Sequence, residues 1–102
     1  MQIFNLDSIT TFPYEERDKN VFFKSYEFKA RIISLLPGEK IPECEMASYV
    51  IFIVLEGEVN VKVNKGKANL VKNQCLITEP SLISMQSIKG ARILGIQIVK
   101  NL

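Results

Sequence analysis

The side chains with the most versatile chemistry in this sequence are two sulfur-bearing residues, Cys44 and Met46, which lie two positions apart. Residues i and i+2 of a β-strand share one face, so a thiolate and a thioether could meet there on a soft ion such as Cu(I). Such a site needs a third soft ligand, and Cys75 supplies one only if its side chain turns inward. We therefore favour packing of both side chains inside the protein over a metal site.

A nucleophilic role for Cys44 requires a neighbouring cation or base that favours the thiolate. No Lys, Arg or His is adjacent to it, and the flanking Glu43 and Glu45 disfavour a second negative charge. The sequence contains no His at all, which excludes Cys-His and Ser-His nucleophile pairs within one chain. We expect an inert thiol.

Glutamates are the obvious candidates for general acid or base chemistry. Glu43 and Glu45 alternate with Cys44 and Met46, so on a strand they face the opposite side. Glu56 and Glu58 are further carboxylates, and solvated carboxylates at a protein surface are the common case. We assign no catalytic residue.

The bulk composition describes a small, nearly neutral chain. Its 102 residues are 47% hydrophobic, which fits one domain spanning residues 1–102. The net charge of +2 is dispersed, so we expect no nucleic-acid partner. The first residues lack a secretory signal pattern, and the longest apolar run, 49–55, is too short to cross a membrane. We expect a cytoplasmic protein without membrane association, in which Cys44 and Cys75 stay reduced.

Short apolar runs, each of strand length, recur between turn signals along the chain. They cover residues 21–23, 28–36, 49–55, 59–63, 70–71, 75–78, 82–85 and 92–99. Turn-forming pairs such as Pro37-Gly38 and Lys89-Gly90 separate them. No window has a sustained helical period. The sequence therefore predicts an all-β sandwich or barrel with little or no helix.

The run 49–55 is apolar on both faces, so both faces must be covered. Val50 and Phe52 share the parity of Cys44 and Met46 and would point into a barrel. The opposite set would lie outside it, where an uncovered strand of this composition aggregates. We expect this set to form a homodimer interface, with cover by the amino-terminal segment as the alternative: Ile51, Ile53 and Leu55.

The stretch from Gly38 to Gly57 resembles the first sequence motif of the cupin family. That motif reads Gly, five residues, His-x-His, three or four residues, Glu, six residues, Gly. Both glycines and the Pro-Gly turn are kept, while Cys44 and Met46 stand at the His positions and Val50 at the Glu position.

The second cupin motif survives only as spacing. It reads Gly, five residues, Pro-x-Gly, two residues, His, three residues, Asn, and its positions fall on Asn73, Glu79, Ser81, Ser84 and Ile88. Pro80 lies one place later than the motif requires. On this alignment Ser84 takes the third His position.

The resemblance implies a small jelly-roll β-barrel of two facing antiparallel sheets. Residues 28–99 would form the barrel, and residues 1–27 would add amino-terminal strands or an arm. A typical cupin binds iron, manganese, zinc, nickel or copper through three His and one Glu, whereas Val50 donates nothing and Ser84 offers only a neutral hydroxyl. We therefore expect no metal and no other cofactor. What remains is a pocket for a small ligand, lined by Cys44, Met46, Val50, Phe52 and Ser84.

Three functions stay open. The first is a metal-free, homodimeric protein that binds an unknown small molecule. The second is a metal-independent enzyme, for example an isomerase or lyase acting on a sugar or small acid, for which Cys44 is the only ionisable side chain at the ligand positions. The third is a filled barrel that acts as a structural or interaction module. We favour the first and rank catalysis below binding.

Overall fold

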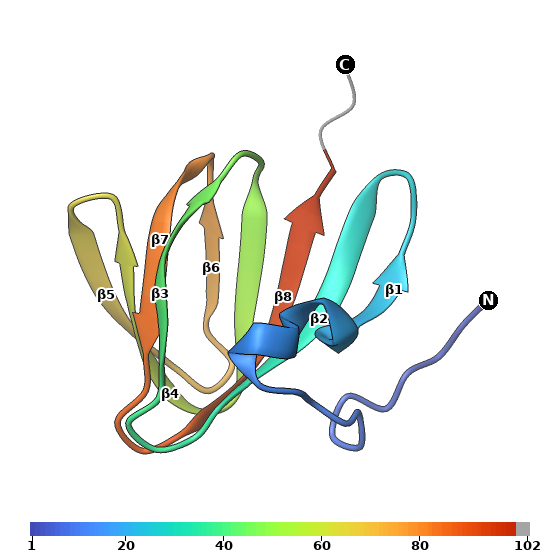
Figure 1. Ribbon diagram of the computed structural model, residues 1–102, viewed down its shortest axis with the longest axis horizontal. Coiled ribbons are helices and arrows are strands. Elements are labelled where there is room, and N and C mark those ends of the chain that lie inside the picture. The colour runs from blue at the N-terminus through green and yellow to red at the C-terminus, as the bar shows by residue number, and fades with distance from the viewer. Residues whose placement is uncertain (100–102) are drawn as a thin grey trace.

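A computed structural model describes residues 1–99 of the chain (Figure 1). Within that range a short 3-10 helix precedes eight strands, and no helix is long and apolar enough to span a bilayer. The elements are η1 (Tyr14–Asn20), β1 (Val21–Lys24), β2 (Phe28–Leu35), β3 (Lys40–Met46), β4 (Val50–Val63), β5 (Gly66–Val71), β6 (Cys75–Thr78), β7 (Ser81–Gln86) and β8 (Ala91–Ile98).

All strand pairs are antiparallel, and the strands curl into a barrel of two facing sheets that share β4 (Figure 1). The first half of β4 pairs with β8 and β6, and together with β2 and β1 they form the first sheet. The second half of β4 pairs with β5 and β7, and together with β3 they form the second sheet. The predicted all-β jelly-roll barrel is confirmed, with helix limited to η1.

Apolar side chains that alternate along the strands pack between the two sheets. In the second half of β4, Val59 and Val61 are buried while Asn60 and Lys62 are exposed, as the two-residue period of a strand requires. The buried residues of this barrel core are Leu35, Val50, Phe52, Val54, Val59, Val61, Leu70, Ile83, Met85, Ala91 and Ile93.

The two motif glycines both have left-handed backbone conformations, with φ of 83° at Gly38 and 74° at Gly57. A Cβ atom on Gly57 would overlap the carbonyl oxygen of Gly90, whereas open space surrounds Gly38. Gly57 thus lets the chain before β8 approach β4 closely, directly after the register shift between Val54 and Glu56. Only glycine can adopt this backbone conformation and also leave room for the Gly90 carbonyl.

The outer face of the first sheet is covered in part by the residues before η1. The guanidinium of Arg92 on β8 donates hydrogen bonds to the carbonyl oxygens of Leu6 (2.8 Å) and Ile9 (2.7 Å). Ile32 of β2 is fully buried, at 0% exposure, although it does not belong to the barrel core. On β6, Ile77 remains 65% exposed. The amino-terminal segment therefore covers the β2 side of this face and leaves the β6 side open.

The three residues predicted to form a dimer interface lie on β4 between these two regions. All three are half-buried: Ile51, Ile53 and Leu55. Ile51 pairs with Ile77 on one side and with Ile96 on the other, so an apolar row crosses the sheet. The amino-terminal segment, which was the alternative source of cover, therefore reaches only part of this face.

Candidate ligand-binding site

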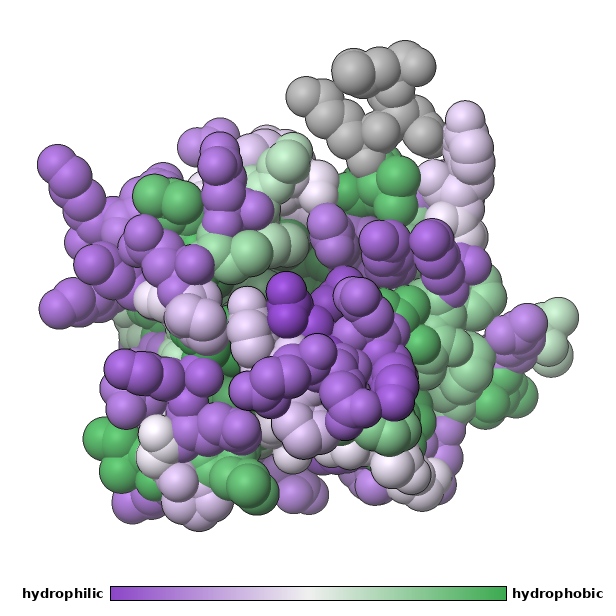
Figure 2. Space-filling view, viewed as in Figure 1, coloured by the Kyte–Doolittle hydropathy of each residue, from purple (hydrophilic) through white to green (hydrophobic). Residues whose placement is uncertain are grey.

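A hollow of about 140 Å³ opens between the two sheets, beside η1. Its wall is mostly apolar and is formed by side chains of β2, β4 and β7, which include Ile33, Val50, Phe52, Ile83 and Met85. Figure 2 shows the face that carries η1, where apolar surface (green) lies in a depression among hydrophilic side chains (purple). A concave apolar wall with a few polar groups is the usual form of a small-molecule site.

A bulge in β3 determines which of its residues point into the hollow. Ile41 pairs with Met85 and Cys44 with Ile83, so three steps along β3 oppose two steps along β7. The extra residue falls next to Pro42, which has no N–H to donate to a regular ladder. After the bulge, the even-numbered positions of β3 face inward.

Four of the five predicted pocket residues line this hollow: Cys44, Met46, Val50 and Phe52. Cys44 lies at the rim, where its thiol is exposed. Glu43 and Glu45 are exposed and do not line the hollow, as expected from their parity.

Ser84 is placed differently from the sequence expectation and has to be reassigned. Along β7, Ser81, Ile83 and Met85 are buried, so Ser84 faces the outside of the second sheet and lines a separate hollow there. The cause is the alignment of the second motif, which fixed the spacing and ignored the displacement of Pro80 by one place. Moving the motif by one place puts Met85 at the inward position, in agreement with the structure.

The polar groups of the hollow come from positions that the motifs did not single out. They are Tyr14, Arg17, Asn20, Arg31, Ser34, Glu39, Lys40 and Gln97. The sequence does indicate an unusual role for Arg31, because it is the one charged residue within 30–36, and an unpaired charge in such an apolar run is uncommon. The sequence gives no such indication for Tyr14 and Arg17, since their approach to the hollow depends on the path of the chain before β1.

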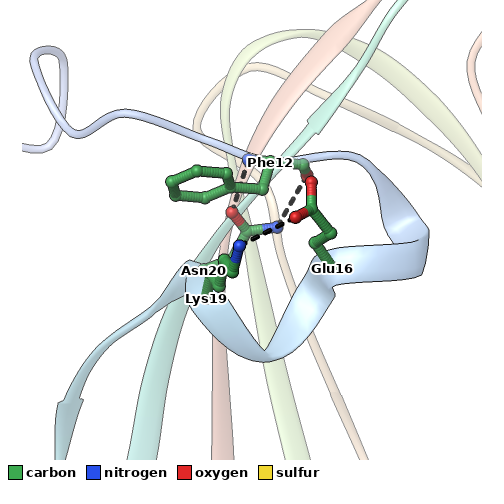
Figure 3. Close-up of polar contacts among 4 residues, drawn as sticks. All are labelled: Phe12, Glu16, Lys19 and Asn20. Carbon is green, nitrogen blue, oxygen red and sulfur yellow. Dashed lines mark hydrogen bonds and ion pairs between the residues drawn. The ribbon is translucent and has the colours of Figure 1, made fainter.

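Asn20 fixes η1 in place beside the hollow. Its buried side chain accepts a hydrogen bond from the N–H of Phe12 (2.7 Å) and donates one to the carbonyl of Phe12 (3.0 Å), as Figure 3 shows. The amide thereby closes the loop between residues 12 and 20 as a pair of backbone hydrogen bonds would. Lys19 adds an exposed ion pair with Glu16 (2.8 Å), and its ammonium lies 5.4 Å from the centroid of the Phe12 ring.

The charged groups in and around the hollow differ in the protein partners that they have. Burial lowers the pKa of Arg31, the nearby Asp18 opposes this effect, and Arg17 adds to it. Arg17 itself lies over the Tyr14 ring, 4.2 Å from its centroid, and donates to the Tyr14 carbonyl. The carboxylate of Glu39 accepts a hydrogen bond from the N–H of Leu36 (2.9 Å). Among residues 1–99, Arg31 and Lys40 both line the hollow without an ion pair or a side-chain hydrogen bond, and Arg31 is the half-buried one of the two, since Lys40 is exposed.

Comparison with known proteins gives matches at the level of structure. No protein-family model and no curated protein matches the sequence. A protein from Thermus thermophilus superposes with a TM-score of 0.84 at 22% identity, over 99% of this chain and 100% of that one. A conserved protein of unknown function from Streptococcus pyogenes gives 0.79 at 10% identity, over 99% and 90%.

A cupin superfamily protein from Desulfitobacterium hafniense DCB-2 superposes with a TM-score of 0.74 at 18% identity, over 78% of this chain and 74% of that one. Several other solved cupins match as well. The chain has the cupin fold. Because the Thermus and Streptococcus proteins match over nearly the whole chain, the combination of this barrel with its amino-terminal segment is not peculiar to this sequence.

The metal centre typical of cupins does not fit the residues found here. The inward positions of the first motif hold Cys44, Met46 and Val50, and the inward position on β7 holds Met85. Val50 has no donor atom and the other three offer only sulfur, whereas a His and Glu centre presents nitrogen and oxygen. Within residues 1–99, no group of three or more His, Cys, Asp or Glu side chains is placed to hold an ion.

Proposed function

We propose that this cupin-fold protein binds a small organic molecule in the hollow beside η1, without a transition metal, and that it does so as a homodimer. The hollow itself is the observation that carries the proposal. Its apolar wall with polar groups at the edge resembles a ligand site, and its volume of about 140 Å³ is that of a site for a molecule smaller than most ligands. A structural module with a solid interior would not need this space.

The metal-free part of the proposal is supported by the donor chemistry of the ligand positions. Cys44, Met46 and Met85 line the hollow together with Val50, so the hard and borderline ions of the cupin family would find no oxygen or nitrogen donor at these four positions. Cys44 and Cys75 are both free and exposed. Exposed thiols persist in a reducing compartment, which supports a cytoplasmic location.

The homodimer is supported by the part of the first sheet that the amino-terminal segment leaves open. Ile77 is 65% exposed beside the half-buried Ile51, and Leu94 and Ile96 continue the row on β8. An apolar face without charge is complementary to a second copy of itself, as a two-fold interface requires. We propose that Ile51, Ile53 and Leu55 lie in this interface.

A metal-independent isomerase or lyase is a second candidate, and one observation favours it. Glu39 and Tyr14 line the hollow, so ionisable side chains reach it in addition to Cys44. A general acid or base needs to lie within hydrogen-bond reach of the reacting proton. Turnover of a bound ligand would move this candidate above simple binding.

Native mass spectrometry of the purified protein tests the proposal in one measurement. We expect a dimer mass with no transition metal, together with a carried-over molecule that is released on denaturation. A stoichiometric transition metal would refute the metal-free claim, and a strict monomer at micromolar concentration would refute the dimer.

A paired substitution at the rim of the hollow tests the site. Cys44→Phe places a ring in the space while its backbone stays in β3, so ligand binding should be lost and the thermal midpoint should change little. Cys44→Ser keeps the original size and should bind as the unmodified protein does. Equal binding by both variants, measured by calorimetry, would show that the ligand lies elsewhere.

A further inference from the structure

Arg31 is a half-buried charge that lines the hollow without an ion-pair partner in the described part of the molecule. It lies in the middle of β2 on the face that it shares with Ile33, and both residues line the hollow. Its strand partner on β8 is Gly95, and a Cβ atom there would lie 3.5 Å from the Arg31 Cγ atom. The missing side chain at Gly95 gives the arginine stem room within the barrel.

The guanidinium of Arg31 has no protein partner among residues 1–99. Within the 4.0 Å limit for an ion pair, the only pair found there is Lys19 with Glu16. Arg17 and Arg92 donate to backbone carbonyls, whereas Arg31 donates to no acceptor in the same range. No buried polar side-chain atom in that range lacks a partner, so the free N–H groups of Arg31 are open to the hollow and to solvent.

A half-buried guanidinium without an ion-pair partner is less stable than a fully hydrated one, because its buried part loses hydration and gains no ion pair, although its N–H groups still reach solvent. The lowered pKa of Arg31, caused first by burial, reports the same cost. Asp18 offsets part of it at a distance, and the carboxylate of Glu39 is engaged by a backbone N–H. An anionic ligand would remove the cost by accepting two parallel N–H bonds from the guanidinium fork.

The size of the hollow limits what else the ligand contains. An apolar cavity of about 150 Å³ holds one benzene ring, and the hollow measures about 140 Å³. The apolar part of the ligand is therefore one ring or a short branched chain. Val50, Phe52 and Met85 provide the apolar wall against which it would pack.

We propose that the hollow binds a small organic monocarboxylate, with its carboxylate paired to Arg31 and its single ring or short branched chain against the apolar wall. This inference rests on the proposed function, since it names the ligand class of the same site. It assigns Arg31 as the residue that pairs with the carboxylate, with the exposed Lys40 as a second cation at the same hollow.

Matched pairs of acid and amide test the inference, because they differ in charge and hardly in shape. Benzoate with benzamide, and 3-methylbutanoate with 3-methylbutanamide, are titrated into the full chain by calorimetry. At least one acid should bind at least about tenfold more tightly than its amide, the factor expected when a charge-assisted hydrogen bond replaces a neutral one. Arg31→Gln should remove that preference, whereas Lys62→Gln, which removes the same charge from the exposed face of β4, should keep it.

The outcomes separate this inference from the proposed function. Equal binding of acid and amide, lost in Cys44→Phe, would overturn the carboxylate and leave small-molecule binding in place. No binding by any of the four probes would count against both.

A second measurement needs no ligand. Arg31→Met should leave the thermal midpoint of the free protein unchanged or raise it, because an uncompensated charge is replaced by an apolar chain of similar length. A fall of several degrees would show that Arg31 has a structural partner and would overturn the inference.

Discussion

Gly57 is the position at which a single atom has the largest predictable effect on the fold. Gly57→Ala adds a Cβ atom to a residue with φ of 74° and pushes it into the carbonyl of Gly90. We expect a loss of about 1–2 kcal/mol from the left-handed backbone and a further loss of about 1–3 kcal/mol from the overlap. Urea unfolding gives the free-energy change.

Gly38→Ala is the matched control for that substitution. Gly38 has a similar φ of 83° but open space around its Cα, so only the backbone loss of about 1–2 kcal/mol applies. Equal losses in the two variants would mean that the contact with Gly90 is relaxed in solution.

Some single residues could be assigned from the sequence, and others could not. Gly38 and Gly57 could be identified because their backbone conformations are needed wherever the motif folds, whatever the side chains do. Ser84 was placed by counting from a motif whose proline had moved, and one place on a strand reverses the face. Arg31 had a visible anomaly, a charge in an otherwise uncharged run, but only the structure shows that no carboxylate meets it.

At the level of elements, η1 depends on one side chain. Asn20→Ala removes both hydrogen bonds to Phe12 and leaves that half-buried N–H and carbonyl without protein partners, which costs about 1 kcal/mol or more. Because these bonds close only the loop before β1, we expect faster amide hydrogen exchange in residues 12–20 and unchanged exchange in β4 and β8.

Asn69→Ala provides the comparison for this prediction. Asn69 donates to the Oδ1 of Asn60 at 2.7 Å on an exposed face, where water replaces the lost bond. Its exchange pattern should match that of the unmodified protein. Unchanged exchange in residues 12–20 of the Asn20 variant would show that other contacts hold η1.

The strands were predictable to different degrees for physical reasons. Both halves of β4 could be predicted from the sequence. The run 49–55 is continuously apolar, as a strand buried on both faces requires, and the run 59–63 alternates, as a strand buried on one face requires. β3 has no apolar run and was indicated only by the spacing of the motif. The bulge beside Pro42 arises from the pairing of β3 with β7, so the sequence of β3 alone does not predict it.

For the whole molecule, the predicted dimer can be tested without disturbing the barrel. Ile77→Lys changes a side chain that is 65% exposed, so the monomer should lose no more than about 0.5 kcal/mol. At an apolar two-fold interface the change introduces two buried cations, and the dimer should dissociate. Light scattering after size exclusion reports the mass.

Ile88→Lys is the control at the level of the whole molecule. Ile88 is 68% exposed in the turn between β7 and β8, outside the proposed interface. This variant should remain dimeric. Dissociation of both variants, or of neither, would place the contact between subunits on another surface.

The bonds from Arg92 to Leu6 and Ile9 also impose an order of events during synthesis. The ribosome makes residues 6 to 9 before any of the strands, whereas the arginine that holds them lies on β8, the last of the described strands. Residues 6 to 9 therefore remain undocked while β1 to β7 are translated, and during that time the apolar residues of β2 and β4 also lack β8, the strand that joins them in the first sheet. A newly made chain is accordingly exposed to aggregation until β8 has been made, and a chaperone that binds extended segments would act before that point.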